Sequence, residues 1–296
     1  CSFPAILCPA LSPGGSKTVV GLWGMLRVRE IGWHQRGWAG WVYSTEKLPE
    51  DSYLGAAPHH TSSLTLRNQP GVDKIIGGYE CSPHSQPWQV SLNTGYHFCG
   101  GSLIADQWVL SAAHCCPDSM QVILGDHNIQ VFEHTEHLMR IETIVLHPSY
   151  DEQTLDHDIM LIKLAHRIQP DAYVRPVPLP TACPEVGSLC TVSGWGNILS
   201  DGCDAKNLQC VEVPIVSDQV CERSYPGMIT STMMCAGYPE GGKDACQGDA
   251  GGPLVCNGEL QGIMSWGFGW AQKDHPSIYT KICSLLSWIK STMAAN

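Results

Sequence analysis

Three polar elements, far apart in the chain, carry residue types that are used in acid–base and nucleophilic chemistry. His114 lies in LSAAHC after an apolar run, and Asp158 opens the apolar run DIMLIKL. The stretch KDACQGDAGGPLVC follows at residues 243–256, where Gly248, Gly251 and Gly252 allow sharp turns and converging backbone N–H groups. Each element alone is weak evidence for a catalytic site, because a single histidine is more often a core residue and Gly-Gly-Pro is more often a turn. Their order in a cysteine-rich chain makes coincidence a poor explanation.

The segments around these elements predict an all-β fold. From Ile75 onward, apolar runs such as PWQVSL, MQVIL and IMLIKL recur between Gly, Pro, Asn and Asp. Short runs with frequent turn residues are typical of a β-sandwich or barrel rather than alternating βα units. Only the tail SLLSWIKSTMAAN fits a helix, because its apolar residues recur at helical spacing. These are Leu285, Leu286, Ile289 and Met293, and we expect an amphipathic helix docked on the barrel.

Composition narrows the class of protein. The 296 residues include 17 Lys+Arg against 28 Asp+Glu, a net charge of −11, and no basic run, so we expect no nucleic-acid partner. The longest apolar stretches, such as residues 19–26, are too short to span a bilayer, so we expect no membrane insertion. Fifteen cysteines indicate an oxidising compartment, and their odd number leaves at least one unpaired within the chain. We expect a secreted monomer.

Residues 1–74 form a separate segment. They are rich in Gly, Pro and Trp, show no sustained helical or strand period and lack a recognisable signal peptide. We interpret them as a leader or propeptide-like segment, disordered or non-native, which Cys1 and Cys8 could tether. Residues 75–296 form the predicted folded domain.

This domain resembles the secreted trypsin-like serine proteases of the chymotrypsin family. The motifs IIGGYE, SAAHC, DIMLIKL, SGWGN, GDAGGP and SWG stand in the family's order. The resemblance implies two six-stranded antiparallel β-barrels with the catalytic cleft between them.

The resemblance also implies catalytic roles. His114 matches the general base, Asp158 the carboxylate that fixes its tautomer, and Ser265 the serine that hydrogen-bonds this carboxylate. Ala250 holds the place of the nucleophilic serine. A methyl group can neither give a proton to imidazole nor form an acyl bond. The amides of Gly248 and Ala250 would still form an oxyanion hole.

Activation residues are present as well. Lys74–Ile75 matches the zymogen cleavage point, so an activating protease at Lys74 is an expected partner. The new amino group of Ile75 would pair with Asp249 and order the oxyanion loop. The acidic run that precedes this Lys in the family is reduced to Asp73. The alternative for Asp249 is a hydrogen-bonded turn residue.

A basic specificity pocket is implied by Asp244, which matches its acidic floor. Ala245 follows, which favours Arg over Lys, and Gly267 leaves one pocket wall open. Ser277 replaces a glycine and would either narrow the pocket or hydrogen-bond Asp244. Trp270 replaces a half-cystine and leaves Cys246 without its usual partner.

The remaining cysteines follow the trypsin framework, and an acidic loop resembles its calcium site. The implied pairs are 81–210, 99–115, 183–283, 190–256 and 221–235, with Cys203–Cys246 conceivable and Cys116 left over. Structural Ca²⁺ would take carboxylates from Asp126, Glu133 and Glu136 and carbonyl oxygens from Asn128 and Val131. The alternative for the carboxylates is a solvated acidic loop. For the histidines of the same stretch, we expect ordinary surface residues rather than a transition-metal site.

Two functional hypotheses therefore stay open. One is a pseudoprotease that binds Arg/Lys-containing peptides or protein protease inhibitors without cleaving them. The other is an active Arg/Lys-specific endopeptidase in which residue 250 has been altered by engineering or error. Changes at Ser277 and Trp270, in the same pocket, favour the first. An interaction module that uses another surface has no positive feature in the sequence.

Overall fold

The computed structural model describes residues 77–117, 119–196, 206–245, 248–268 and 271–296. The predicted leader, the cleavage point Lys74–Ile75, and the positions of Cys203, Cys246 and Trp270 lie outside these ranges. Among the described residues, no helix is both long and apolar enough to cross a membrane.

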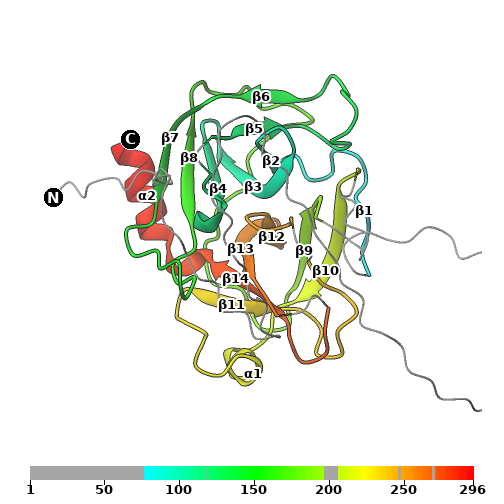
Figure 1. Ribbon diagram of the computed structural model, residues 1–296, viewed down its shortest axis with the longest axis vertical. Helices are drawn as coiled ribbons and strands as arrows, with labels where there is room; N and C mark the ends of the chain where they lie inside the picture. The colour runs from blue at the N-terminus through cyan, green and yellow to red at the C-terminus, as the bar shows by residue number, and fades with distance from the viewer. Residues whose placement is uncertain (1–76, 118, 197–205, 246–247, 269–270) are drawn as a thin grey trace, which may run out of the picture. The chain divides into compact units, whose positions relative to one another are not determined.

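The first half of the domain is a seven-stranded antiparallel sheet (Figure 1). Its strands are, in spatial order, β6 (His137–Met139), β5 (Gln121–Leu124), β2 (Gln89–Asn93), β3 (His97–Ala105), β4 (Trp108–Ser111), β8 (Met160–Leu164) and β7 (Ile141–Leu146). Only Arg140 separates the two outermost strands, β6 and β7, along the chain. The sheet therefore closes on itself through one bent strand that pairs with β5 at one end and β8 at the other.

The second half is another seven-stranded antiparallel sheet. Its order is β1 (Tyr79–Glu80), β10 (Gln209–Pro214), β9 (Leu189–Gly194), β12 (Pro253–Cys256), β13 (Glu259–Trp266), β14 (Ser277–Lys281) and β11 (Met233–Ala236). Strand β1 contributes only two paired residues at the edge of β10.

These sheets confirm the predicted all-β trypsin fold. Seven strands replace the expected six in each half for two reasons: β6 and β7 are two parts of one bent strand, and β1 is a short addition to a sheet edge. The sequences of the buried strands do not alternate strictly between apolar and polar residues, because both faces of these strands are covered. In β2, Val90 and Leu92 lie in the core while Gln89 on the other face accepts a 2.7 Å hydrogen bond from Ser193 of β9.

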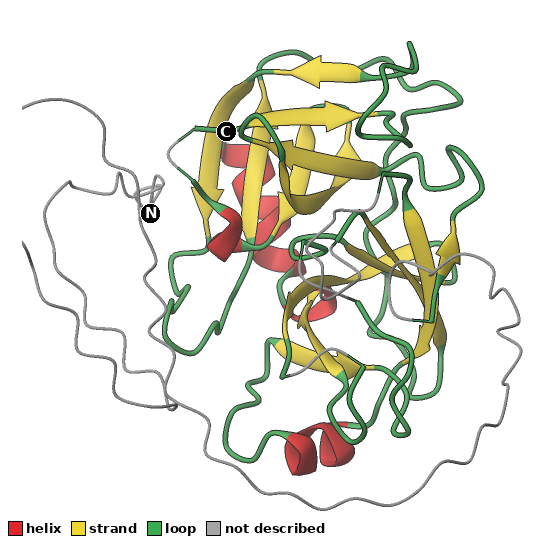
Figure 2. Cartoon of the chain, turned by 45° about the vertical axis from the view of Figure 1, so that its right-hand side comes forward, coloured by secondary structure: helices red, strands yellow, loops and turns green. Residues whose placement is uncertain are grey.

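Helices are few (Figure 2). They are η1 (Ala113–Cys115), α1 (Asp218–Ser224), η2 (Ile282–Ser284) and α2 (Leu286–Ala295). The predicted C-terminal helix is confirmed as α2, whose Ile289 is fully buried in the core of the first sheet. Ser217 caps α1 by accepting a hydrogen bond from the Val220 amide.

Among the described residues, five disulfides form the pairs that the resemblance implies. They are Cys81–Cys210, Cys99–Cys115, Cys183–Cys283, Cys190–Cys256 and Cys221–Cys235. Cys116, which sequence reasoning left over, is also disulfide-bonded. The Cys183–Cys283 link spans 100 residues, so it restricts the unfolded chain strongly.

Candidate active site

His114 and Asp158 are held together at the ends of two paired strands. His114 lies in η1 directly after β4, and Asp158 lies two residues before β8, which pairs with β4. The imidazole Nδ1 is 2.7 Å from Asp158 Oδ2, and the His114 backbone amide donates to Oδ1 at 3.0 Å. Ser265 Oγ donates to Oδ2 at 2.5 Å. Asp158 is completely buried, so these donors replace its hydration.

The electrostatics of this group stabilise the protonated imidazole more than water does for a free histidine. Burial alone would lower the pKa of His114, but the hydrogen bond and the negative charge of Asp158 outweigh it and raise the pKa above its usual value. The Asp158 contact at Nδ1 leaves Nε2 as the atom available for proton transfer.

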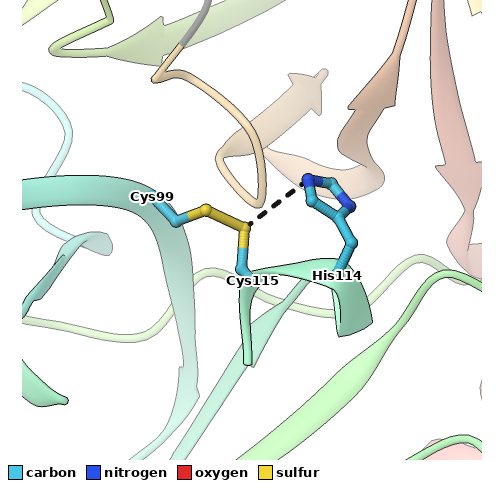
Figure 3. A group of neighbouring side chains, drawn as sticks. All are labelled: Cys99, His114 and Cys115. Atoms are coloured by element: carbon cyan, nitrogen blue, oxygen red, sulfur yellow. Dashed lines mark hydrogen bonds between the residues drawn. A yellow bond between two sulfur atoms is a disulfide. The ribbon is translucent and has the colours of Figure 1, made fainter. Parts of the chain in front are cut away.

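The Nε2 atom faces a disulfide (Figure 3). It lies 3.8 Å from Sγ of Cys115, which is bonded to Cys99. His114, Cys99 and Cys115 offer their ligand atoms within 4.8 Å of one another. Both sulfurs are consumed in the disulfide, however, and metal binding by cysteine requires the thiolate. These three residues are therefore not a metal site.

The segment 248–252 is fixed through its backbone. His97 Nε2 lies 3.1 Å from the Gly248 carbonyl, and the Ala250 carbonyl accepts from the Gly100 amide at 2.7 Å. The Gly251 amide donates to the Met264 backbone carbonyl, and the Gly252 amide donates to the Asp249 backbone carbonyl. Among the described residues, the Gly248 and Ala250 amides have no backbone acceptor, so they are candidates for binding a ligand oxygen.

Close approach to the first sheet explains why glycine is needed at 251. Its φ is +79°, and an added Cβ would lie 2.3 Å from Ser111 Oγ and 3.3 Å from the Ala112 amide nitrogen. Ala112 stands two residues before His114. The loop that contains Ala250 therefore lies against the segment that carries His114, as a catalytic arrangement requires.

Asp249 is completely buried beside a second glycine. Its Oδ1 accepts from the Gly196 amide at 2.8 Å. An added Cβ on Gly194 would lie 2.1 Å from the same oxygen. Gly194 therefore makes room for the carboxylate. The predicted pairing of Asp249 with Ile75 involves a residue outside the described ranges.

Asp244 is surrounded by hydrogen-bond donors. Ser277 Oγ and the Ala245 amide donate to its Oδ1, and the Ala271 amide donates to Oδ2 at 2.8 Å. Burial raises the pKa of Asp244 more than these three bonds lower it, so the carboxyl group titrates above its usual range. Across from it, a Cβ on Gly267 would lie 3.6 Å from Ser277 Oγ. Of the two alternatives expected for Ser277, the structure contains the hydrogen bond to Asp244.

A third cluster lies in the loop between β5 and β6. Asp126, Glu133 and Glu136 each offer a carboxylate oxygen within 4.8 Å of the others. Glu133 Oε2 accepts from the His127 and Asn128 amides, and Glu136 accepts from the Glu133 and Thr135 amides. Asp126 Oδ1 is buried with no hydrogen-bond partner among the described residues. Burial and the two glutamates raise the pKa of Asp126 to about 7.

Comparison with known proteins identifies the family. The family profile described as Trypsin matches residues 75–289. The chain belongs to the trypsin family of serine proteases. It is 56% identical over 222 residues to "Trypsin-2" of Salmo salar, which covers 75% of this chain and 96% of that protein. It is 57% identical over 225 residues to "Serine protease 1" of Rattus norvegicus, covering 76% and 92%. The human "Serine protease 1" is 56% identical over 225 residues, covering 76% and 91%.

Within this trypsin-family domain, sequence reasoning missed the backbone partners. The Ala271 amide on Asp244 and the Gly100 amide on Ala250 could not be anticipated, because a main-chain donor leaves no mark on residue type. His97 carried no recognisable signal either, since it lies in an ordinary strand.

The two carbonyl ligands predicted for the acidic loop belong to Asn128 and Val131. The Asn128 carbonyl accepts a hydrogen bond from the Val131 amide at 2.9 Å, and Val131 is 58% exposed.

Proposed function

We propose that this protein is a secreted trypsin-family pseudoprotease that binds basic peptides or protein protease inhibitors without cleaving them. The observation that carries the proposal is Ala250. It stands in a loop whose backbone is fixed against the segment of His114, yet its side chain is only a methyl group.

Loss of the attacking oxygen removes the acyl-enzyme route. The His114–Asp158–Ser265 group can accept a proton, but no hydroxyl is present at residue 250 to give one. Removing the nucleophile from subtilisin costs on the order of 10⁶-fold in kcat, about 8–9 kcal/mol of barrier. Residual hydrolysis would then rely on water and the oxyanion amides alone.

Binding does not need that oxygen. Asp244 is a buried carboxylate whose charge costs free energy unless a cation pairs with it. A Lys or Arg side chain from a ligand supplies this cation. Ser277 satisfies part of Asp244 in the free protein, so the ligand competes with it and binds more weakly than to an open carboxylate.

The alternative is an active endopeptidase that cleaves after Arg or Lys and in which residue 250 has been altered. One specific observation favours it: every hydrogen bond from His114 through Asp158 to Ser265 is in place. The proposal differs from this alternative in treating Ser277 as a second loss in the same domain.

A single substitution separates the two. The full chain and its Ala250→Ser variant would be cleaved after Lys74 with an added protease, freed of that protease, and assayed on Arg and Lys amide substrates. If the protein is a pseudoprotease whose pocket has also changed, the amidase activity of the serine variant should stay far below that of an ordinary trypsin. Both forms should bind benzamidine, a mimic of the arginine side chain. Full activity on restoring the serine would support the altered-enzyme alternative. An Ala250→Ser, His114→Ala double variant controls for contaminating protease.

We also propose that the acidic loop binds Ca²⁺. Three converging carboxylates and the buried, unpartnered Asp126 oxygen suit a hard divalent cation, which would neutralise their mutual repulsion. Calcium should therefore raise the melting temperature of the wild type relative to chelator. Glu136→Gln should reduce this increase, while Glu142→Gln, an exposed glutamate of β7, should keep it. Equal melting temperatures with Ca²⁺ and with chelator would contradict the site.

Secretion is the third part of the proposal. Five disulfides among the described residues suit an oxidising compartment and would be reduced in most cytosols. We also expect an activating protease to cleave after Lys74 and the protein to be a monomer. Detection of the protein in the medium of expressing cells would test secretion.

A further inference from the structure

The carboxylate of Asp156 joins the segment that precedes Asp158 to the second sheet. Its Oδ1 atom accepts hydrogen bonds from the hydroxyls of Thr230 and Thr232, at 2.6 and 2.5 Å. Thr232 directly precedes β11, and its carbonyl accepts from the amide of Lys281 at the end of β14. Asp156 itself lies four residues before β8 of the first sheet. We call Asp156, Thr230 and Thr232 the Asp156 clasp.

The clasp also holds His157, the residue between Asp156 and Asp158. The His157 backbone amide donates to Asp156 Oδ1 at 3.0 Å and to Thr232 Oγ1 at 3.2 Å. The His157 Nδ1 atom lies 3.0 Å from Asp156 Oδ2. Burial alone would raise the pKa of Asp156, but the threonine hydroxyls and His157 outweigh it and lower the pKa below its usual value. Asp156 is therefore ionised at neutral pH, which strengthens each hydrogen bond that it accepts.

The backbone on both sides of Asp156 adopts an unfavourable conformation. Leu155 and His157 have φ angles of +57° and +53°, in the left-handed region that favours glycine. Such angles persist in other residues only where surrounding contacts fix them. The clasp supplies these contacts, so residues 155–157 should relax when it is removed. Because His157 is bonded to Asp158, this relaxation would move the Asp158 backbone.

Other contacts of Asp158 also come from the second sheet. Thr280 of β14 donates to the Asp158 carbonyl at 2.7 Å, and Ser265 of β13 donates to its carboxylate. His114, in contrast, follows β4 of the first sheet. The 2.7 Å separation between His114 Nδ1 and Asp158 Oδ2 therefore depends on how the second sheet holds residues 156–158.

We propose that Asp156 is a positioning residue, which directs the Asp158 carboxylate toward His114 by holding the His157 backbone against the second sheet. The pKa of His114 is shifted by its burial and by Asp158, so Asp156 acts through the position of Asp158 rather than through its own charge. This role concerns the His114–Asp158 pair and does not depend on the proposed binding of basic peptides.

Nuclear magnetic resonance on the full chain with labelled histidine tests the role of Asp156. The His114 signals are assigned by their loss in His114→Ala. Asp156→Ala should lower the proton affinity of the His114 imidazole about tenfold and broaden the low-field signal of its Nδ1 proton, because Asp158 is no longer held in place. Asp156→Asn keeps an oxygen that accepts from both threonines, so its His114 proton affinity should stay within about twofold of the wild type.

Two further variants separate positioning from stability, with thermal melting recorded for each. Thr232→Val removes a hydroxyl from the second-sheet side of the clasp and should also lower the His114 proton affinity. Asp171→Ala removes a carboxylate that likewise accepts two amides of its own loop, and it should leave His114 unchanged.

Three outcomes would overturn the role of Asp156. The first is a lower melting temperature of Asp156→Ala with an unchanged His114 proton affinity, which indicates stability alone. The second is an Asp156→Asn variant that behaves like Asp156→Ala, because charge would then be responsible. If Asp156→Ala does not fold, the third decides: an unchanged His114 signal in folded Thr232→Val.

Discussion

Replacing Ser277 by glycine should open the Asp244 pocket. In the free protein Ser277 Oγ donates to Asp244 Oδ1, and the Ala245 amide donates to the same oxygen. A guanidinium or amidinium group binds a carboxylate through both oxygens, so it must displace the Ser277 hydroxyl. A hydrogen bond to a charged group contributes about 1.5–3 kcal/mol. Ser277→Gly should therefore tighten benzamidine binding by about 10- to 100-fold.

The matched variant Ser277→Ala separates charge competition from steric blockage. It removes the hydroxyl but keeps the Cβ near the Gly267 wall, where a Gly267 Cβ would be 3.7 Å from the Ser277 Cα. If the hydrogen bond dominates, Ala and Gly should strengthen binding similarly; if space dominates, only Gly should do so. Isothermal titration with benzamidine supplies the affinities.

Removing the Ser277 hydroxyl, in either variant, should also lower the stability of the folded protein, and this loss serves as a second readout. Asp244 is buried and would lose one of its three donors in the free state. The free energy of unfolding without ligand should fall by about 1–3 kcal/mol. Unchanged benzamidine affinity in both variants would refute the reasoning, because the Ser277 contact would then not compete with the ligand.

Three further results are expected. Gly251→Ala should destabilise the domain by at least about 2 kcal/mol in thermal unfolding, because its Cβ would lie 2.3 Å from Ser111 Oγ. Gly187→Ala, with φ +85° but open space around it, controls for backbone strain alone. Burial and the neighbouring His157 lower the pKa of His147 to about 4, from 6.5 in the unfolded chain. The unfolded state therefore binds the proton first, and stability is lost as pH falls from about 6.5 to about 4. Urea titrations should show a weaker loss in His147→Gln, and parallel curves would contradict the assignment. Calcium affinity, measured by calorimetry, should rise up to tenfold per pH unit below about 7, because the proton on Asp126 must leave first. A pH-independent affinity would argue against Asp126 as a ligand.

Much of the domain could be predicted because its motifs combine residue type with order. The Cys pairs were implied by the resemblance and the C-terminal helix by its apolar spacing, and the structure contains both. Strand number was less predictable, since the break at Arg140 is a local bend within an unbroken sequence pattern.

The site was predictable only where side chains carry it. His114, Asp158 and Ser265 meet as the family resemblance implied. The contacts that fix residues 248–252 are made by main-chain groups, which any residue possesses.

The backbone anchoring of the loop has a consequence for evolution. Its fixed points are the Gly248 and Ala250 carbonyls and the Gly251 and Gly252 amides, none of which depends on the side chain at residue 250. Selection for correct folding and export would therefore not detect a change at that position. A gene of this kind can lose peptide-bond cleavage in one step while its product still passes cellular quality control, and the lineage can then be retained for binding alone.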